Sequence, residues 1–345
     1  MTRTPAKSAG AAVALTLVES LQQRLVAGLA SVGHTVGIPT VLEPAQWLRD
    51  GGRHGGGERY GIGDHALFNR ASVNVSQVHY DDDPARRLAS ATALSTIVHP
   101  DNPHGPSVHM HFSWTEMRDN GGYWRMMADL NPSIEDADAT QAFAAALQEA
   151  AGDCYEEGRA QGDRYFFIPA LDRHRGATHF YLEGYSTPDP HADAALARRV
   201  GEAAIDQYCA ILQAAVTAHP TPTEAERQQQ LAYHTLYLLQ VLTLDRGTTS
   251  GLMIHSDNDV GVLGSLPRQV DRALLASWRD RQSPPQDSLV DGLVAVLVDA
   301  SPSPVTVETK RALADVVRAH YTEHPEALAY QASGNSTPPT VANHQ

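Results

Sequence analysis

Three short stretches between residues 71 and 114 carry the main strand-forming pattern of this sequence. Ala71–His79 (ASVNVSQVH) alternates apolar and polar residues and is rich in β-branched side chains, which is typical of a half-buried β-strand. Leu94–His99 and Val108–Trp114 predict further strands, and the Pro-Asp-Asn-Pro segment between them predicts a rigid turn. Long helical patterns follow, without regular strand–helix–strand alternation. The chain is therefore predicted to be an α+β fold, not a doubly wound one.

The rest of the sequence adds long amphipathic helices and a few shorter elements. Near the N-terminus, Val18, Leu25 and Val32 are among the apolar residues at helical spacing, which predicts a helix of about 20 residues. Further predicted helices are Asp138–Arg159, Ala192–His219, Ser288–Val298 and Val307–His320; predicted strands are Tyr165–Ile168, Thr178–Leu182, Leu236–Leu244 and Val260–Leu266; Asp50–Gly63 is predicted to be a glycine-rich loop. We expect Tyr165–Ile168 and Thr178–Leu182 to pair.

The composition excludes several classes of partner. A formal net charge of −14 disfavours nucleic acid or an anionic membrane surface, because both need concentrated Lys and Arg. The two cysteines, Cys154 and Cys209, give no disulfide framework and favour a reducing compartment. No apolar run reaches the roughly 18 residues that a membrane span needs. We therefore expect a cytoplasmic protein with no membrane span and no nucleic-acid partner.

Eight short motifs occur in one order between about residues 45 and 280. They are GGGER (55–59), VNVSQVH (73–79), HPDNPHGPSVH (99–109), DLNP (129–132), YFFI (165–168), RG (175–176), LDRGT (244–248) and SLP (265–267). Their order and spacing resemble the oxygen-dependent coproporphyrinogen III oxidases of haem biosynthesis. The ordered joint occurrence of these motifs carries the resemblance, since each motif alone is weak.

The resemblance implies a large antiparallel sheet flanked by helices on both faces, and a homodimer. It also implies an oxidoreductase that converts propionate side chains of coproporphyrinogen III to vinyl groups with dioxygen as co-substrate, without a flavin, haem or clearly required metal. Residues 1–280 would form this catalytic domain, residues 281–332 a helical C-terminal extension, and residues 333–345 a disordered tail.

The resemblance also assigns site residues. His109 matches a histidine of the family, Asp129 an aspartate that faces the pyrrole nitrogens, and Arg175 an arginine of a glycine-rich segment. Asp245 and Arg246 match the Asp-Arg pair of the last long motif. We expect His109 and Asp129 to handle protons, and Arg175 and Arg246 to hold substrate carboxylates.

Several departures from the family pattern favour a smaller substrate. Glycines that would let a flat macrocycle lie against the backbone are replaced by side chains, as in Gly122–Met127, and at least two basic residues suited to carboxylates are lost. Arg125 and Arg173 are candidates to compensate for them. The alternative hypothesis is therefore a divergent oxidase or decarboxylase of a smaller acid, amino acid or peptide in specialised metabolism.

A gain of histidine suggests a metal. His109 and His111 are two residues apart, so on a strand both rings project from one face, a spacing that metal sites use. His179 is expected across the same cleft, and this set of His109, His111 and His179 would suit iron or copper. A third hypothesis is a non-catalytic relative that binds a tetrapyrrole or a protein partner.

Overall fold

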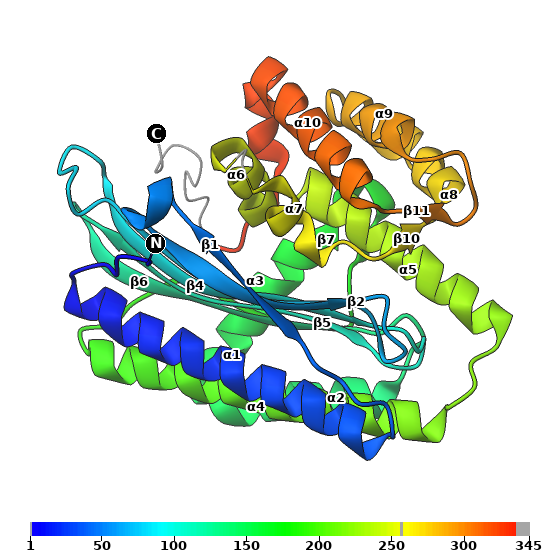
Figure 1. Ribbon diagram of the computed structural model, residues 1–345, viewed down its shortest axis with the longest axis horizontal. Coiled ribbons are helices and arrows are strands. Elements are labelled where there is room, and N and C mark those ends of the chain that lie inside the picture. The colour runs from blue at the N-terminus through cyan, green and yellow to red at the C-terminus, as the bar shows by residue number, and fades with distance from the viewer. Residues whose placement is uncertain (1, 256–257, 336–345) are drawn as a thin grey trace.

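A seven-stranded antiparallel sheet forms the middle layer of the molecule (Figure 1). The computed structural model describes residues 2–255 and 258–335. In spatial order the strands are β1 (Glu43–Leu48), β2 (Gly55–Gly63), β3 (Phe68–His79), β4 (Leu88–Pro100), β5 (Ser107–Met117), β6 (Gly121–Asn131) and β9 (Thr178–Tyr185). The strands predicted at 71–79, 94–99 and 108–114 lie within β3, β4 and β5, so the strand prediction is confirmed there.

Helices cover both faces of the sheet, which confirms the predicted α+β class (Figure 1). One face is covered by α1 (Ala9–Thr35), α2 (Ala137–Ala151) and α4 (Pro190–Ala218). The opposite face carries α5 (Glu224–Thr243), α6 (Arg246–Ile254), α7 (Asp259–Val262), α8 (Arg272–Ser277), α9 (Gln286–Val296) and α10 (Val307–Glu323). The remaining helix, α3 (Tyr155–Phe166), packs against the edge strand β9.

Residue alternation along the strands gives the sheet one apolar and one polar face. In β5, Val108, Met110 and Phe112 belong to the core formed with α1 and α4. The intervening residues His109 and His111 project from the other face, because successive side chains of a strand point to opposite sides. The polar face is therefore the one that α5, α6 and α7 cover, and His109 and His111 project from it.

Two predictions are wrong: the loop at residues 50–63 and the strand at residues 165–168. The predicted loop Asp50–Gly63 contains strand β2. Glycine is required inside it: Gly55 has φ +94°, and a Cβ there would lie 2.1 Å from the Gln77 carbonyl oxygen. The segment Tyr165–Ile168 ends α3, and only Phe167–Ile168 is a strand, β7, paired with β8 (Arg173–His174). Thr178–Tyr185 pairs instead with β6.

The strands predicted at Leu236–Leu244 and Val260–Leu266 are also wrong. The first segment lies in α5, whose residues 230–243 are buried except at one position. A helix buried all round has no polar face, so its sequence lacks the helical periodicity and looks like a buried strand. The second segment forms α7 and a short 3-10 turn, Leu263–Ser265.

The predicted helices of the C-terminal extension are present as α9 and α10. Leu293 of α9 and Leu313 of α10 lie in one apolar cluster with Leu239 of α5 and Leu275 of α8. The extension therefore packs directly on the helices that cover the polar face of the sheet. Of the predicted tail, residues 336–345 lie outside the described residues. No described helix is both long and apolar enough to cross a membrane.

Candidate active site

A cavity of about 340 Å³ lies between the polar face of the sheet and helices α5, α6 and α7. Its volume is in the range of small-molecule sites. Two rows of cross-strand neighbours build its floor. One row runs Arg59, Asn74, Ser95, His111, Met127 and Tyr181, from β2 to β9; the next runs Ser72, Ile97 and His109 and continues to Asp129 and His179.

The carboxylate of Asp129 bridges His109 and Arg175. His109 and Asp129 are direct partners in the β5–β6 register, so their side chains leave the same face of the sheet. Asp129 Oδ1 lies 2.8 Å from His109 Nδ1, and Asp129 Oδ2 lies 2.7 Å from a terminal nitrogen of Arg175. Asn131 donates a further hydrogen bond of 2.6 Å to Oδ2. Three predicted site residues, distant in the sequence, thus form one connected unit.

This unit sets the protonation of His109. Burial alone would raise the pKa of Asp129, but the charges of Arg175 and His109 outweigh it and lower that pKa to about 2. An ionised carboxylate can only accept, so His109 Nδ1 carries the hydrogen. His109 Nε2 forms no hydrogen bond to any residue that the structure describes, and the ring lines the cavity. The imidazole is therefore oriented with its free nitrogen available to a bound molecule.

Asp129 itself is fully buried behind His109 and is not part of the cavity wall. Its carboxylate contacts His109 and Arg175, so it reaches the cavity only through His109. That Asp129 handles protons stays a prediction. Arg175 does hold a carboxylate, but it is that of Asp129. Its other terminal nitrogen donates to Gln240 at 2.6 Å, and its guanidinium packs over the Phe166 and Tyr237 rings.

Asp245 and Arg246 lie at the start of α6, and both line the cavity. The Asp245 carboxylate caps α6 by accepting from Thr248 N at 2.7 Å, and it accepts a second hydrogen bond of 2.7 Å from Tyr165 Oη. Burial opposes its ionisation, but the hydrogen bond from Thr248 and the nearby His109 lower the pKa of Asp245 on balance. Arg246 donates to the buried carboxylate of Glu183, so its charge is already met within the protein.

Comparison with known proteins identifies the family of this chain. A sequence model of the coproporphyrinogen III oxidase family matches residues 14–301. The chain belongs to the coproporphyrinogen III oxidase family. The mitochondrial oxygen-dependent coproporphyrinogen-III oxidases of Rattus norvegicus and Homo sapiens are 26% and 25% identical to it over 277 residues. The aligned part is 73% of this chain, and the chain spans about 60% of the length of these relatives.

Two further cations of this coproporphyrinogen oxidase family member face the cavity. Arg59 of β2 and Arg125 of β6 form no ion pair with any described residue. Burial lowers the pKa of Arg59, and Arg125 has a buried Nε without a partner and a 3.3 Å contact to Tyr123 Oη. Sequence reasoning missed Arg59, although it ends the motif GGGER. Of the two arginines that the sequence offers in place of the lost basic residues, Arg125 lines the cavity. The other, Arg173, is exposed and does not line it.

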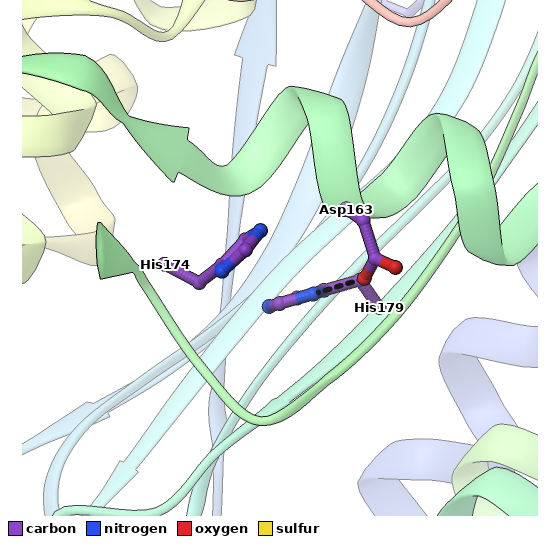
Figure 2. A group of neighbouring side chains, drawn as sticks. All are labelled: Asp163, His174 and His179. Carbon is purple, nitrogen blue, oxygen red and sulfur yellow. Dashed lines mark hydrogen bonds and ion pairs between the residues drawn. The ribbon is translucent and has the colours of Figure 1, made fainter. Parts of the chain in front are cut away.

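The predicted metal set of His109, His111 and His179 is not brought together. Phe166 lies between the first and last: its ring meets His109 edge-on at 6.2 Å and stacks on His179 at 5.3 Å. His111 lines the cavity, where burial and the charges of Arg125 and His109 lower its pKa to about 3. Within residues 2–255 and 258–335, the one group of three metal-ligating side chains close enough to share an ion is Asp163, His174 and His179 (Figure 2).

Proposed function

We propose that this chain is a dioxygen-dependent oxidative decarboxylase whose substrate is coproporphyrinogen III. The observation that carries the proposal is the His109–Asp129–Arg175 unit, which presents one oriented imidazole nitrogen to a cavity lined by unpaired arginines. Membership of the family supports the reaction type, and the names of the mammalian relatives support the substrate.

The reaction balances without a further redox partner. A side chain R–CH₂–CH₂–COO⁻, dioxygen and one proton give R–CH=CH₂, carbon dioxide and hydrogen peroxide. The C–C bond to the carboxylate breaks, and its electron pair forms the new double bond. The carbon next to the pyrrole loses a C–H bond, and that electron pair reduces dioxygen.

The chain offers a residue for each requirement of this reaction. His109 Nε2 and the ionised Asp245 are the bases that reach the cavity and can take or hold the pyrrole N–H proton. Asp129 is a positioning residue, since it acts through His109. Arg59 and Arg125 are candidates to hold carboxylates, because both are partly buried cations that gain an ion pair on binding. Their strands, β2 and β6, are four steps apart in the sheet, so the two strand backbones are separated by about 19 Å at about 4.8 Å a step.

The direct test is an assay with anaerobically prepared coproporphyrinogen III, started with oxygenated buffer. We expect vinyl product, carbon dioxide and hydrogen peroxide in equal amounts. If folded protein gives no vinyl product, the substrate assignment is rejected. If, in addition, His109→Ala leaves every measurable activity and binding property unchanged, the non-catalytic hypothesis replaces this one.

One observation favours a smaller acid as a second candidate. Arg125 and Met127 project from β6 into the cavity, at positions where the family resemblance predicts glycine. The double variant Arg125→Gly, Met127→Gly separates the candidates. If coproporphyrinogen is the substrate, removing Arg125 should raise its KM. If the side chains exclude a macrocycle, the double variant should gain turnover of coproporphyrinogen that the unmodified chain lacks.

Two expectations from the resemblance accompany this proposal. We expect a homodimer, which light scattering after size-exclusion chromatography would detect as twice the 37.2 kDa chain mass. We also expect a cytoplasmic location, which fractionation of the source cells would test.

A further inference from the structure

Three side chains from different elements converge beside β9, the edge strand of the sheet. Asp163 comes from α3, His174 from β8 and His179 from β9 (Figure 2). One ligand atom of each lies within 4.8 Å of the others. Asp163 and His174 are accessible to solvent, and His179 is buried. The group is therefore open on one side and anchored on the other.

The hydrogen bonds of His179 orient the nitrogen that a metal would bind toward the Asp163 carboxylate. Its Nε2 lies 2.8 Å from the main-chain carbonyl oxygen of Arg175, which can only accept, so Nε2 carries the hydrogen. Its Nδ1 lies 2.9 Å from Asp163 Oδ1, which also accepts, so Nδ1 carries a hydrogen in the metal-free chain. An ion bound between the two atoms would replace that proton. A metal-ligating histidine commonly donates its other ring nitrogen to a carbonyl, which fixes the ring and its tautomer. His179 has this arrangement already.

Packing holds the two imidazoles near each other. The His179 ring stacks on Phe166 at 5.3 Å, and the His174 ring contacts Phe167 at 5.2 Å. The two histidine rings lie 5.2 Å apart with an angle of 30° between them. His174 is exposed and can turn one ring nitrogen toward an ion without displacing a buried group.

The carboxylate of Asp163 is also suited to bind a cation. Its Oδ2 is 3.1 Å from a terminal nitrogen of Arg159, so Oδ1 alone faces the histidines. A monodentate ligand through Oδ1 would leave the Arg159 pair intact.

We propose that Asp163, His174 and His179 bind one divalent transition-metal ion of the zinc type. The ligands are Asp163 Oδ1, His179 Nδ1 and one ring nitrogen of His174, with water completing the shell on the exposed side. Two imidazoles and a carboxylate are a donor set that suits Zn²⁺. The site is separate from the cavity, and binding there does not depend on the proposed oxidase activity.

The ion would also fix the backbone next to the active site. Residues 174 and 179 flank Arg175, whose carbonyl accepts from His179 and whose side chain holds Asp129. Binding would tie this segment to α3. We therefore expect the bound form to be more resistant to thermal unfolding than the free form.

The test uses the full chain, stripped with a chelator and dialysed, and titrated with ZnCl₂ in a calorimeter. We expect one ion per chain and a concentration-dependent rise in Tm. Asp163→Asn and His174→Ala should each weaken binding at least tenfold and remove the rise in Tm. His191→Ala is the matched control, because His191 is exposed and its side chain forms no hydrogen bond with the described residues.

His174→Ala carries the decision, since an exposed side chain can be removed without unfolding the chain. The proposal is overturned if the unmodified chain binds no Zn²⁺, or if His174→Ala binds it as tightly as the unmodified chain and His191→Ala do. Either result leaves the oxidase proposal untouched, because vinyl formation is measured separately.

Discussion

Asp129 Oδ1 lies 2.8 Å from His109 Nδ1, across the β5–β6 pair and directly behind the cavity wall. The two residues are twenty positions apart in the chain, yet they are direct cross-strand partners. Because Arg175 holds the other oxygen of Asp129, His109 is oriented by a carboxylate whose position is fixed on both sides. This relationship makes His109 the centre of the first prediction.

Replacing His109 should remove a proton-transfer group without disturbing the core. We expect His109→Ala to lower kcat/KM for coproporphyrinogen by about 10²- to 10⁴-fold, which is the usual contribution of a general acid or base. His104→Ala is the control, because His104 pairs with Glu226 and does not line the cavity. Equal losses in the two variants would contradict a special role for His109.

Replacing Asp129 should destabilise the fold as well as the reaction. Asp129→Asn leaves Arg175 buried with an uncompensated charge, which costs about 3–5 kcal/mol. Urea unfolding at pH 7 measures this loss. Asp119→Asn breaks an exposed pair with Arg87 and should leave the free energy of unfolding nearly unchanged, because water screens the pair. A loss at Asp129 no larger than that at Asp119 would show that the buried pair does not stabilise the chain.

The two unpaired arginines should govern substrate affinity. Arg59→Gln and Arg125→Gln each remove a hydrogen bond to a carboxylate, which is worth about 1.5–3 kcal/mol, or roughly ten- to a hundredfold in KM. We expect kcat to change less, since neither residue is a base. Arg87→Gln, an exposed arginine outside the cavity, should leave KM unchanged. Unchanged KM in both cavity variants would remove these residues from the binding site.

Lys310 should make stability depend on pH. Burial, together with the charges of Arg70 and Arg59, lowers the pKa of this α10 lysine to about 7, from 10.5 in an unfolded chain. Below pH 7 the folded chain carries the full cost of a buried charge. Between pH 7 and 10.5 the unfolded chain binds a proton that the folded chain does not, so stability rises with pH.

Lys310→Met removes this cost. The variant should be more stable than the unmodified chain at pH 7, and its advantage should shrink by up to about 1.4 kcal/mol per pH unit on going to pH 9. Urea unfolding at several pH values measures the difference. Lys7→Met is the control, because Lys7 is exposed. An advantage that does not change with pH would contradict the lowered pKa.

The sequence alone determined the elements whose two faces differ in polarity. The helices α1 and α4 and the strands β3, β4 and β5 each bury one side and expose or use the other, and this difference appears as a period of 3.6 or 2 residues. The ordered motifs also identified the family. His109, Asp129, Arg175, Asp245 and Arg246 followed from those motifs, and all five lie at the cavity or directly behind it.

Only the tertiary structure decided what periodicity and motifs do not encode. Residues 230–243 of helix α5 are buried on nearly all sides, so this part of the helix has no polar face. Strand β2 forms because glycine lets its backbone approach β3 closely. The roles of the charged residues depended on contacts between distant segments: Asp129 lies behind His109, Glu183 neutralises Arg246, and His179 meets Asp163 and His174 instead of His109. A charged group interacts most strongly with groups that lie within a few ångströms of it. Folding, and not order along the chain, determines which groups those are.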